Sequence, residues 1–321
     1  MQEIIKIVLL TLVCLLIFSG VGSAQGQPVR MAYLHNDIHH LALWVAQDKN
    51  YFQQENVDIE IAGAFNAGPE LMSAFAAGEL DMAYVGAAPA TVAVANKAAD
   101  VAILAGANTE GSALVAQKAA DYKQLKELAG KTVAVPGHST VQDFLLRRAL
   151  KDKAIQADEL DIMIQSPPEM VSALRANQID AFVAWEPYPA RAHTDCIGHN
   201  LKTSAEIWPD HPCCVLVVDK DYFKDNPQTV RAVLQAHVTA TEFIQNNKEQ
   251  AINTGVEHTG MDRDTVQQAL QTVEFTPLLN KEAQTEYVEF LNELGYIDVD
   301  DARAFVDRLI DPEILNEIWS E

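Results

Sequence analysis

The sequence predicts an α/β protein made of two lobes of similar build, followed by a helical C-terminal part. Apolar runs of strand length alternate with helical segments in two successive series, which is typical of mainly parallel sheets covered by helices. One pattern also occurs twice: residues 73–86 read SAFAAGELDMAYVG, and residues 172–185 read SALRANQIDAFVAW. Each copy combines a helix end, a tight turn through Gly or Asn, and an Asp that enters a short apolar strand. The alternative is that this pattern is simply frequent in α/β proteins.

The first series starts with an apolar strand at residues 29–34. A helix with one buried face is expected within residues 39–56, and a second strand at 57–64. Gly68-Pro69 opens the next helix, because proline is tolerated in the first helical turn. A strand at 81–86, a helix opened by Ala88-Pro89 and a strand at 101–108 complete this series.

The second series repeats the alternation. A short helix within 121–131 should end at Gly130, before a strand that begins at residue 132. Ser139 and Gln142 have the spacing of a capping box for a helix over 139–152. A strand at 161–166, a helix at 167–178 and a strand at 180–185 follow. Residues 211–223 predict a strand that returns to the first lobe, and the chain is expected to be helical from Pro227 onward.

The first 24 residues have the layout of a secretory signal peptide. Lys6 precedes a nearly unbroken apolar run at residues 7–18, and small residues at Gly22 and Ala24 suit cleavage after Ala24. A transmembrane anchor is the alternative, although the run is short for a span of roughly 20 residues. We therefore expect a periplasmic or otherwise extracytoplasmic protein.

Charge and cysteine content narrow the function classes. The formal net charge is −22 without a basic cluster beyond Arg147-Arg148, which argues against nucleic-acid binding. Three cysteines follow the signal segment, so one disulfide is the most that can form, from Cys196 to Cys213 or Cys214. Small buried thiols are the alternative. The adjacent pair has poor spacing for a metal site.

The order of several loose motifs resembles the solute-binding proteins of ABC transporters for sulfonate, taurine, nitrate and thiamine-precursor uptake. The motifs are ALWVAQDKNYFQQENVDIEI, GELDMAYVG, LKELAGKTVAVP, NQIDAFVAWEPYPA and HPCCVLVV, and the resemblance covers nearly the whole chain after the signal segment. It implies a class II periplasmic-binding-protein fold with two crossover strands, near residues 112–117 and 213–218. Lobe I would comprise residues 25–118 and 213–321, and lobe II residues 119–212.

The two lobes are expected to face each other across a cleft at the carboxyl ends of their strands, where ligands bind in open α/β sheets. Helix starts there attract anions or polar oxygens. The segment GHST at 137–140 is the best of them, although Ser139 could simply cap its helix. The candidate ligand-binding residues are Asp37, His39, His40, Phe65, Asn66, Gly86, Ala87, Ala88, Gly137, His138, Ser139, Thr140, Trp185 and Glu186.

Two of these groups leave alternatives open. The segment HNDIHH at 35–40 could supply polar ligand contacts or solvated loop residues, or it could bind a metal; no resident metal is expected, because His35, Asp37 and His39 need not converge. The resemblance places Glu186 in the cleft, which would favour a solute with an amine or ring N–H. Its alternative is a hinge or helix-capping carboxylate.

These observations predict an exported, non-enzymatic protein that closes on a small polar nutrient. The resemblance adds delivery of a sulfonate-, amino-sulfonate- or heterocycle-like solute to the transmembrane subunits of an ABC permease. We expect a monomer that needs no cofactor. The alternatives are an enzyme of cofactor-precursor synthesis on the same scaffold, and a secreted ligand-sensing domain. No nucleophile elbow, P-loop or HExxH motif supports the enzyme.

Overall fold

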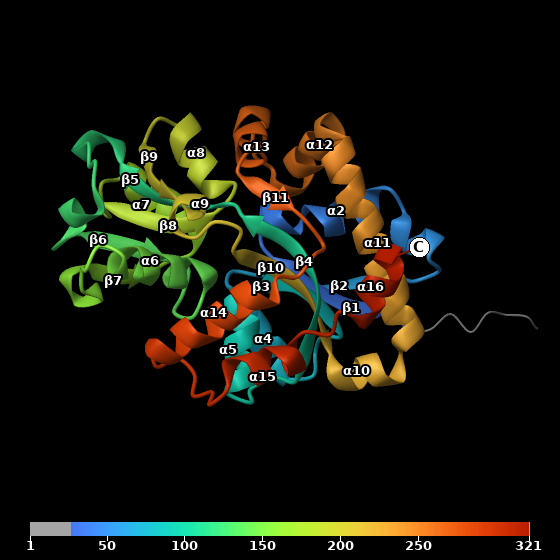
Figure 1. Ribbon diagram of the computed structural model, residues 1–321. Helices are drawn as coiled ribbons and strands as arrows, with labels where there is room; N and C mark the ends of the chain where they lie inside the picture. The colour runs from blue at the N-terminus through green and yellow to red at the C-terminus, as the bar shows by residue number, and fades with distance from the viewer. Residues whose placement is uncertain (1–26, 321) are drawn as a thin grey trace, which may run out of the picture.

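A computed structural model describes residues 27–320, and two separate sheets divide this part of the chain into two lobes (Figure 1). The expected signal peptide lies outside the described residues. The first sheet has the order β11 (Val273–Phe275), β4 (Val101–Glu110), β10 (Pro212–Asp219), β3 (Met82–Gly86), β1 (Val29–Leu34) and β2 (Ile59–Phe65). The second has the order β7 (Asp161–Ile164), β6 (Thr132–Val135), β8 (Ala181–Trp185), β5 (Ser112–Gln117) and β9 (Gly198–Thr203).

Both sheets are mixed. Strands β1, β2 and β3 run parallel, as do β6, β7 and β8, whereas β10 and β5 are antiparallel to their neighbours. The chain changes sheet at Gly111, between β4 and β5, and again in the loop before β10. By sheet membership, the second lobe therefore begins at β5, before the boundary expected at residue 118. The expected return of the chain along β10 is confirmed.

Helices cover both faces of the first sheet, with α2, α11 and α12 on one side and α4, α5 and α15 on the other (Figure 1). The helices of the first lobe are η1 (Ile38–His40), α2 (Leu41–Asp48), α3 (Tyr51–Gln54), α4 (Gly68–Ala76), α5 (Ala87–Ala95), α10 (Lys220–Asp225), α11 (Pro227–Asn246), α12 (Lys248–Thr259), α13 (Arg263–Ala269), α14 (Lys281–Glu293), α15 (Ala302–Leu309) and α16 (Glu313–Ser320). Those of the second lobe are η2 (Lys118–Ala120), η3 (Leu125–Leu128), α6 (Val141–Lys151), η4 (Ala157–Glu159), α7 (Pro167–Arg175), α8 (Tyr188–Thr194) and α9 (Ser204–Ile207).

The repeated sequence pattern has the same structural role in each lobe. After α4 the chain turns through Gly78 with φ 71°, and after α7 through Asn177 with φ 57°. The aspartate that follows accepts a hydrogen bond from a backbone N–H within the first two residues of the parallel neighbour strand. Asp81 Oδ2 accepts from Arg30 N at 2.8 Å, and Asp180 Oδ2 accepts from Thr132 N at 3.1 Å. The pattern is therefore a strand-start cap that is used once in each sheet.

Three local expectations differ from the structure. The helix expected within 39–56 is split into η1, α2 and α3, since Asn50 adopts a left-handed conformation with φ 56°. The helix expected before Gly130 is only the single 3₁₀ turn η3. The C-terminal part is not wholly helical, because β11 adds an edge strand to the first sheet.

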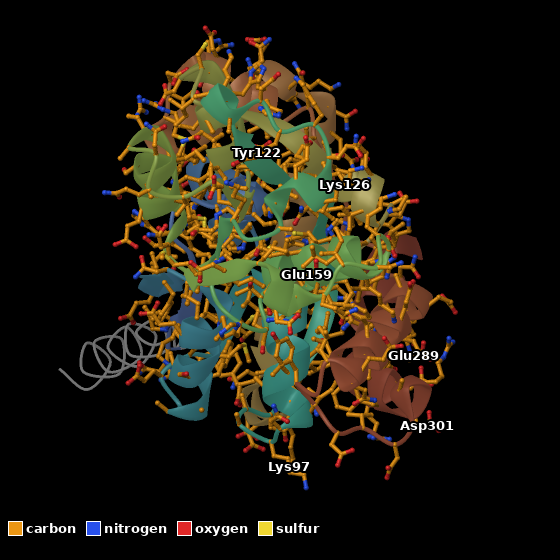
Figure 2. The ribbon with its side chains drawn as sticks, turned by 90° about the vertical axis from the view of Figure 1, so that its left-hand side faces the viewer. Lys97, Tyr122, Lys126, Glu159, Glu289 and Asp301 are labelled. Atoms are coloured by element: carbon orange, nitrogen blue, oxygen red, sulfur yellow. The ribbon has the colours of Figure 1, made fainter. Side chains whose placement is uncertain are left out.

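Charged side chains lie on the outside of both lobes. Figure 2 shows Lys126 and Glu159 on the second lobe and Lys97 and Asp301 on the first, and all four are exposed. Within residues 27–320, no helix combines the length and the apolar character that a membrane span requires.

Candidate ligand pocket between the lobes

A narrow pocket lies where the two lobes meet, at the carboxyl ends of β1, β3 and β8. Six of its residues come from the first lobe and four from the second. They are Leu34, Asp37, Gly68, Gly86, Pro89 and Cys214, with Thr140, Val141, Gln142 and Trp185. The lobes are thus closed on each other, and the pocket is where the expected cleft was placed.

Three helices of at least one full turn begin at this pocket. Helices α4 and α5 begin at Gly68 and Ala87, and neither has a side-chain cap on its first N–H groups. Helix α6 is capped by Thr140, whose Oγ1 accepts from Asp143 N at 3.2 Å and donates to Gly137 O at 2.7 Å. Uncapped N–H groups and the positive ends of helix dipoles favour an anionic or polar oxygen here.

The cap of α6 corrects one expectation. Ser139 was expected to cap this helix, but it adopts a left-handed conformation with φ 62°, and its N–H donates to Asp143 Oδ2 at 3.1 Å. A cap residue needs extended backbone geometry, which Thr140 has at φ −81° and ψ 161°. The capping residue is therefore one position later in the chain than the sequence predicted.

Trp185 and Asp37 supply two further polar groups at the pocket. The indole Nε1 of Trp185 is buried and has no hydrogen-bond partner among the described residues. Asp37 is only 1% exposed, and its Oδ1 accepts from His39 N at 3.0 Å, which caps η1. Burial raises the pKa of Asp37 to about 7, although the neighbouring His39 opposes this. The pocket is thus lined by one residue with an unpaired buried donor and one with a buried carboxyl.

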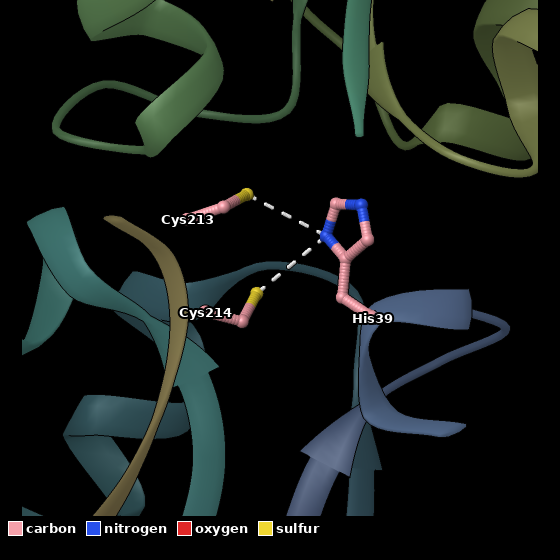
Figure 3. Close-up of side chains that lie close together, drawn as sticks. All are labelled: His39, Cys213 and Cys214. Atoms are coloured by element: carbon pink, nitrogen blue, oxygen red, sulfur yellow. Dashed lines mark hydrogen bonds between the residues drawn. The ribbon is translucent and has the colours of Figure 1, made fainter. Parts of the chain in front are cut away.

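His39, Cys213 and Cys214 form a compact buried cluster beside Asp37 (Figure 3). The Nδ1 atom of His39 lies 3.5 Å from Cys213 Sγ, 3.7 Å from Cys214 Sγ and 3.3 Å from Asp37 Oδ1. The other ring nitrogen, Nε2, lies 2.8 Å from the carbonyl oxygen of Gly111. Because a carbonyl only accepts, Nε2 carries a proton, and Nδ1 faces the two sulfurs.

A bulge explains how two adjacent strand residues reach one histidine. Successive side chains of a regular strand point to opposite faces. The pairing of β10 with β4 shifts register between Pro212 and Cys214 and again between Cys214 and Val215. This irregularity turns both sulfurs toward His39, which is a common effect of bulges beside functional sites.

The cluster also perturbs the pKa values of its members. Burial opposes charge on His39, but the Asp37 carboxylate and the Cys213 sulfur outweigh it and raise the pKa of His39 to about 9. Burial opposes the thiolate of Cys213, but the hydrogen bond from Cys214 and the charge on His39 lower the pKa of Cys213 well below its usual value. Burial together with Cys213 raises the pKa of Cys214. One thiolate beside an imidazolium is the result.

The other expected site residues are spread over several environments. Ala87 and Ala88 are buried in α5, beside Gly86 at the pocket, and Gly137 is buried behind Thr140. Asn66 is exposed and Phe65 is half-buried, and neither lines the pocket. His138 and Ser139 border a different, mostly apolar crevice beside α4 and α5.

Glu186 is the clearest departure among the expected site residues. Its Oε2 accepts from Ala190 N at 3.0 Å, and its Oε1 accepts from Thr272 Oγ1 at 3.2 Å. Glu186 therefore caps α8 and ties it to the first lobe, on the side of a groove between α8 and α13. Burial raises the pKa of Glu186 to about 7. The capping alternative is the one that the structure supports, because both carboxylate oxygens are engaged at α8 and Thr272 and Glu186 does not line the pocket.

The histidines of the segment 35–40 and the three cysteines after the signal segment each include exposed and buried members. His35 is exposed, whereas His39 and His40 are buried, and His40 Nδ1 accepts from Leu34 N at 3.1 Å. Among the described residues Cys196 is an exposed free thiol and Cys213 and Cys214 are buried free thiols, so of the two alternatives the structure has buried thiols rather than a disulfide.

Gln142 and Cys214 line the pocket but were not among the expected ligand-binding residues. The adjacency of the two cysteines was the only sequence signal for Cys214, and the sequence pointed to Gln142 only as part of a capping box, not as a pocket residue.

The comparisons with known proteins agree with this architecture. Residues 22–255 match the profile described as NMT1-like family. The taurine-binding periplasmic protein of Escherichia coli K12 is 29% identical over 206 residues, which cover 63% of each chain. Among solved structures, the periplasmic nitrate-binding protein NrtA of Synechocystis PCC 6803 superposes with a TM-score of 0.82 at 17% identity, over 91% of this chain and 88% of that one.

A second solved structure has the same fold. The ligand-binding component of an ABC-type import system from Staphylococcus aureus, solved with zinc bound, has a TM-score of 0.80 at 22% identity, over 91% of this chain and 99% of that one. These superpositions confirm the expected class II periplasmic-binding-protein fold, with two lobes and a mixed sheet in each. The curated relatives include the nitrate/nitrite binding protein NrtA of Nostoc sp. PCC 7120, which is 27% identical over 233 residues that cover 65% of this chain and 52% of that one.

Proposed function

Because the chain belongs to the NMT1-like family and is the solute-binding component of an ABC import system, we propose that it captures a small polar nutrient between its lobes and delivers it to the transmembrane subunits of a permease. The proposed solute is a sulfonate, an amino-sulfonate or a small polar heterocycle. Taurine- and nitrate-binding relatives support a small solute with anionic oxygens.

The pocket geometry is the observation that carries this proposal. Uncapped starts of α4 and α5 and the buried, unpaired indole N–H of Trp185 all offer donors to one small space. Buried donors are normally satisfied, so an acceptor is the missing partner. The carboxyl of Asp37 in the same space disfavours a purely anionic guest. A solute that also carries an amine or ring N–H, such as an amino-sulfonate, would complement both the donors and the carboxyl, although the lobes must part to admit it because the cavity now holds about 10 Å³.

Contacts outside the pocket support capture by closure. The ring of Phe144 on α6 lies 4.1 Å from that of Tyr287 on α14, measured between centroids, and both side chains are fully buried. On the opposite side, Thr194 on α8 bonds Thr265 on α13 at 2.8 Å. These helices belong to different lobes, so the contacts form only when the lobes are closed, as in hinge-type domain closure.

Export and a monomeric state complete the proposal. Periplasmic relatives and the signal-like first 24 residues support an extracytoplasmic location. A single chain contributes every wall of the pocket, so one copy suffices for binding.

Thermal unfolding with a solute panel tests the proposal. Taurine, an alkanesulfonate, nitrate and a pyrimidine should be added to the mature chain, and a zwitterionic amino-sulfonate is expected to raise the Tm most, by linkage. Trp185→Phe should weaken this effect, because it removes the free indole donor while keeping an aromatic ring. His138→Ala is the matched control, since His138 is exposed outside the pocket. If no solute shifts the Tm or compacts the protein in small-angle scattering, the proposal fails.

A further inference from the structure

We propose that His39, Cys213, Cys214 and Asp37 form a tetrahedral binding site for Zn²⁺ on the floor of the pocket. The proposal concerns the metal alone and does not depend on which solute the protein carries. It departs from the sequence-based expectation that no metal is resident.

The spacing of the ligand atoms supports this assignment. Zn–S bonds of about 2.3 Å and Zn–N or Zn–O bonds of about 2.0 Å place tetrahedral N and S ligands about 3.6 Å apart, and N and O ligands about 3.3 Å apart. The His39 Nδ1 distances to the two sulfurs are 3.5 and 3.7 Å, and the distance to Asp37 Oδ1 is 3.3 Å. Cys214 Sγ lies 3.9 Å from Asp37 Oδ2. His39, Cys213 and Cys214 therefore already have the separations of three zinc ligands, and the carboxylate of Asp37, which lies beside His39 and Cys214, would turn to supply the fourth.

The tautomers decide which histidine is the ligand. His39 donates its Nε2 proton to Gly111 O, which fixes the ring as an outer-shell carbonyl does in known zinc sites and directs Nδ1 at the sulfurs, where a metal would take the place of the Nδ1 proton. His40 uses Nδ1 to accept from Leu34 N, so its remaining nitrogen carries a proton in the neutral ring. His40 therefore lies beside the site, with Nε2 3.7 Å from Asp37 Oδ2, but it is not a ligand.

Charge and burial point to a soft divalent cation. All four proposed ligands are buried, and two thiolates with one carboxylate would place three negative charges in a nearly dry site. Without a metal, protons must neutralise them; Zn²⁺ would replace these protons and leave one negative charge. Thiolate and imidazole donors favour Zn²⁺ over Mg²⁺ or Ca²⁺. The residual negative charge keeps the preference for a solute with a positive group.

Metal titration of the reduced, chelator-treated chain tests the site. We expect one Zn²⁺ per chain by elemental analysis, and Co²⁺ substitution should produce intense visible bands with near-ultraviolet thiolate-to-cobalt absorption. Cys214→Ser should weaken Zn²⁺ binding by on the order of a hundredfold or more, because thiolates are dominant zinc ligands. Cys196→Ser is the matched control, since this cysteine is exposed and outside the cluster, and it should bind like the wild type.

Two results would overturn the proposal: wild-type chain that takes up no Zn²⁺, or Cys214→Ser that binds it as tightly as wild type. If the variant does not fold, as judged by far-ultraviolet circular dichroism, the cobalt spectrum of the wild type decides. The absence of thiolate-to-cobalt absorption then refutes the site. Loss of solute binding in Trp185→Phe with retained Zn²⁺ binding would separate this site from the proposed transport function.

Discussion

His237, one of the buried histidines of the first lobe, should make the protein lose stability as the pH falls below 6.5. His237 on α11 is fully buried, and its Nε2 donates to Gly106 O at 2.8 Å, so its Nδ1 must accept from the hydroxyl of Tyr84 at 2.9 Å. Both hydrogen bonds suit the neutral ring. Burial lowers the pKa of His237 from 6.5 to about 4, although the bond to Gly106 opposes this shift.

The magnitude follows from proton linkage. The unfolded chain binds a proton at this histidine near pH 6.5, whereas the folded chain does so only near pH 4. Lowering the pH from 8 should therefore destabilise the fold through His237 by about 0.8 kcal/mol at pH 6 and about 2 kcal/mol at pH 5. The loss of unfolding free energy through His237 should level off at about 3 kcal/mol below pH 4. A depressed histidine pKa gives this sign, since stability is fully present only above the unfolded pKa.

Urea unfolding of the wild type and of His237→Gln at pH 8, 6 and 5 isolates this contribution. All other titrating groups are shared, so the difference in unfolding free energy between the two proteins should shrink by about 2 kcal/mol from pH 8 to pH 5. Identical pH profiles for the two proteins would refute the reasoning, because His237 would then titrate normally in the folded state.

Three further predictions concern the framework of the lobes. Gly111→Ala should destabilise the fold by roughly 3 kcal/mol in urea unfolding, because φ at this position is +77° and the new methyl group would lie 2.3 Å from His39 Nε2. Gly130→Ala is the control, since φ is +72° but the space around it is open, and it should cost only about 1 kcal/mol. Equal losses in the two variants would contradict a steric clash at Gly111. Phe144→Ala should lower the free energy of unfolding by roughly 3–5 kcal/mol and, because Phe144 packs on Tyr287 of the other lobe, should increase the radius of gyration in small-angle scattering. An unchanged radius of gyration would contradict a role of Phe144 in holding the lobes together. Asp180→Ala should lower the free energy of unfolding by roughly 1–3 kcal/mol, because it leaves Thr132 N and the hydroxyl of Tyr122 without acceptors. Wild-type stability of this variant in urea unfolding would contradict the prediction.

Local sequence patterns were sufficient for most of the framework. The strands β1, β3, β6 and β8 follow from short apolar runs, and the repeated helix–turn–Asp pattern predicted two lobes because each copy caps a parallel strand. Pro69 also marks the start of α4 as expected. These features depend on contacts within or between neighbouring segments, so the chain specifies them locally.

The cap of α6 and the role of Glu186 show where local reasoning reached its limit. Both Ser139 and Thr140 are good cap residues, and only the left-handed turn at Ser139 decided between them. Glu186 follows β8 as the resemblance required, but the turn aims it at Ala190 and Thr272. The direction of a side chain after a strand depends on backbone angles that residue identity does not fix.

The sequence by itself determined the alternation of strands and helices, the duplicated lobe and the edge at which the pocket forms. Only the tertiary structure decided which side chains converge at that edge. His39 and the two cysteines are far apart in the chain, and a register shift in β10 turns both sulfurs toward the same ring nitrogen. Such convergence arises from the pairing of β10 with β3 and β4 inside the first lobe, and these long-range contacts leave no periodic trace in the sequence.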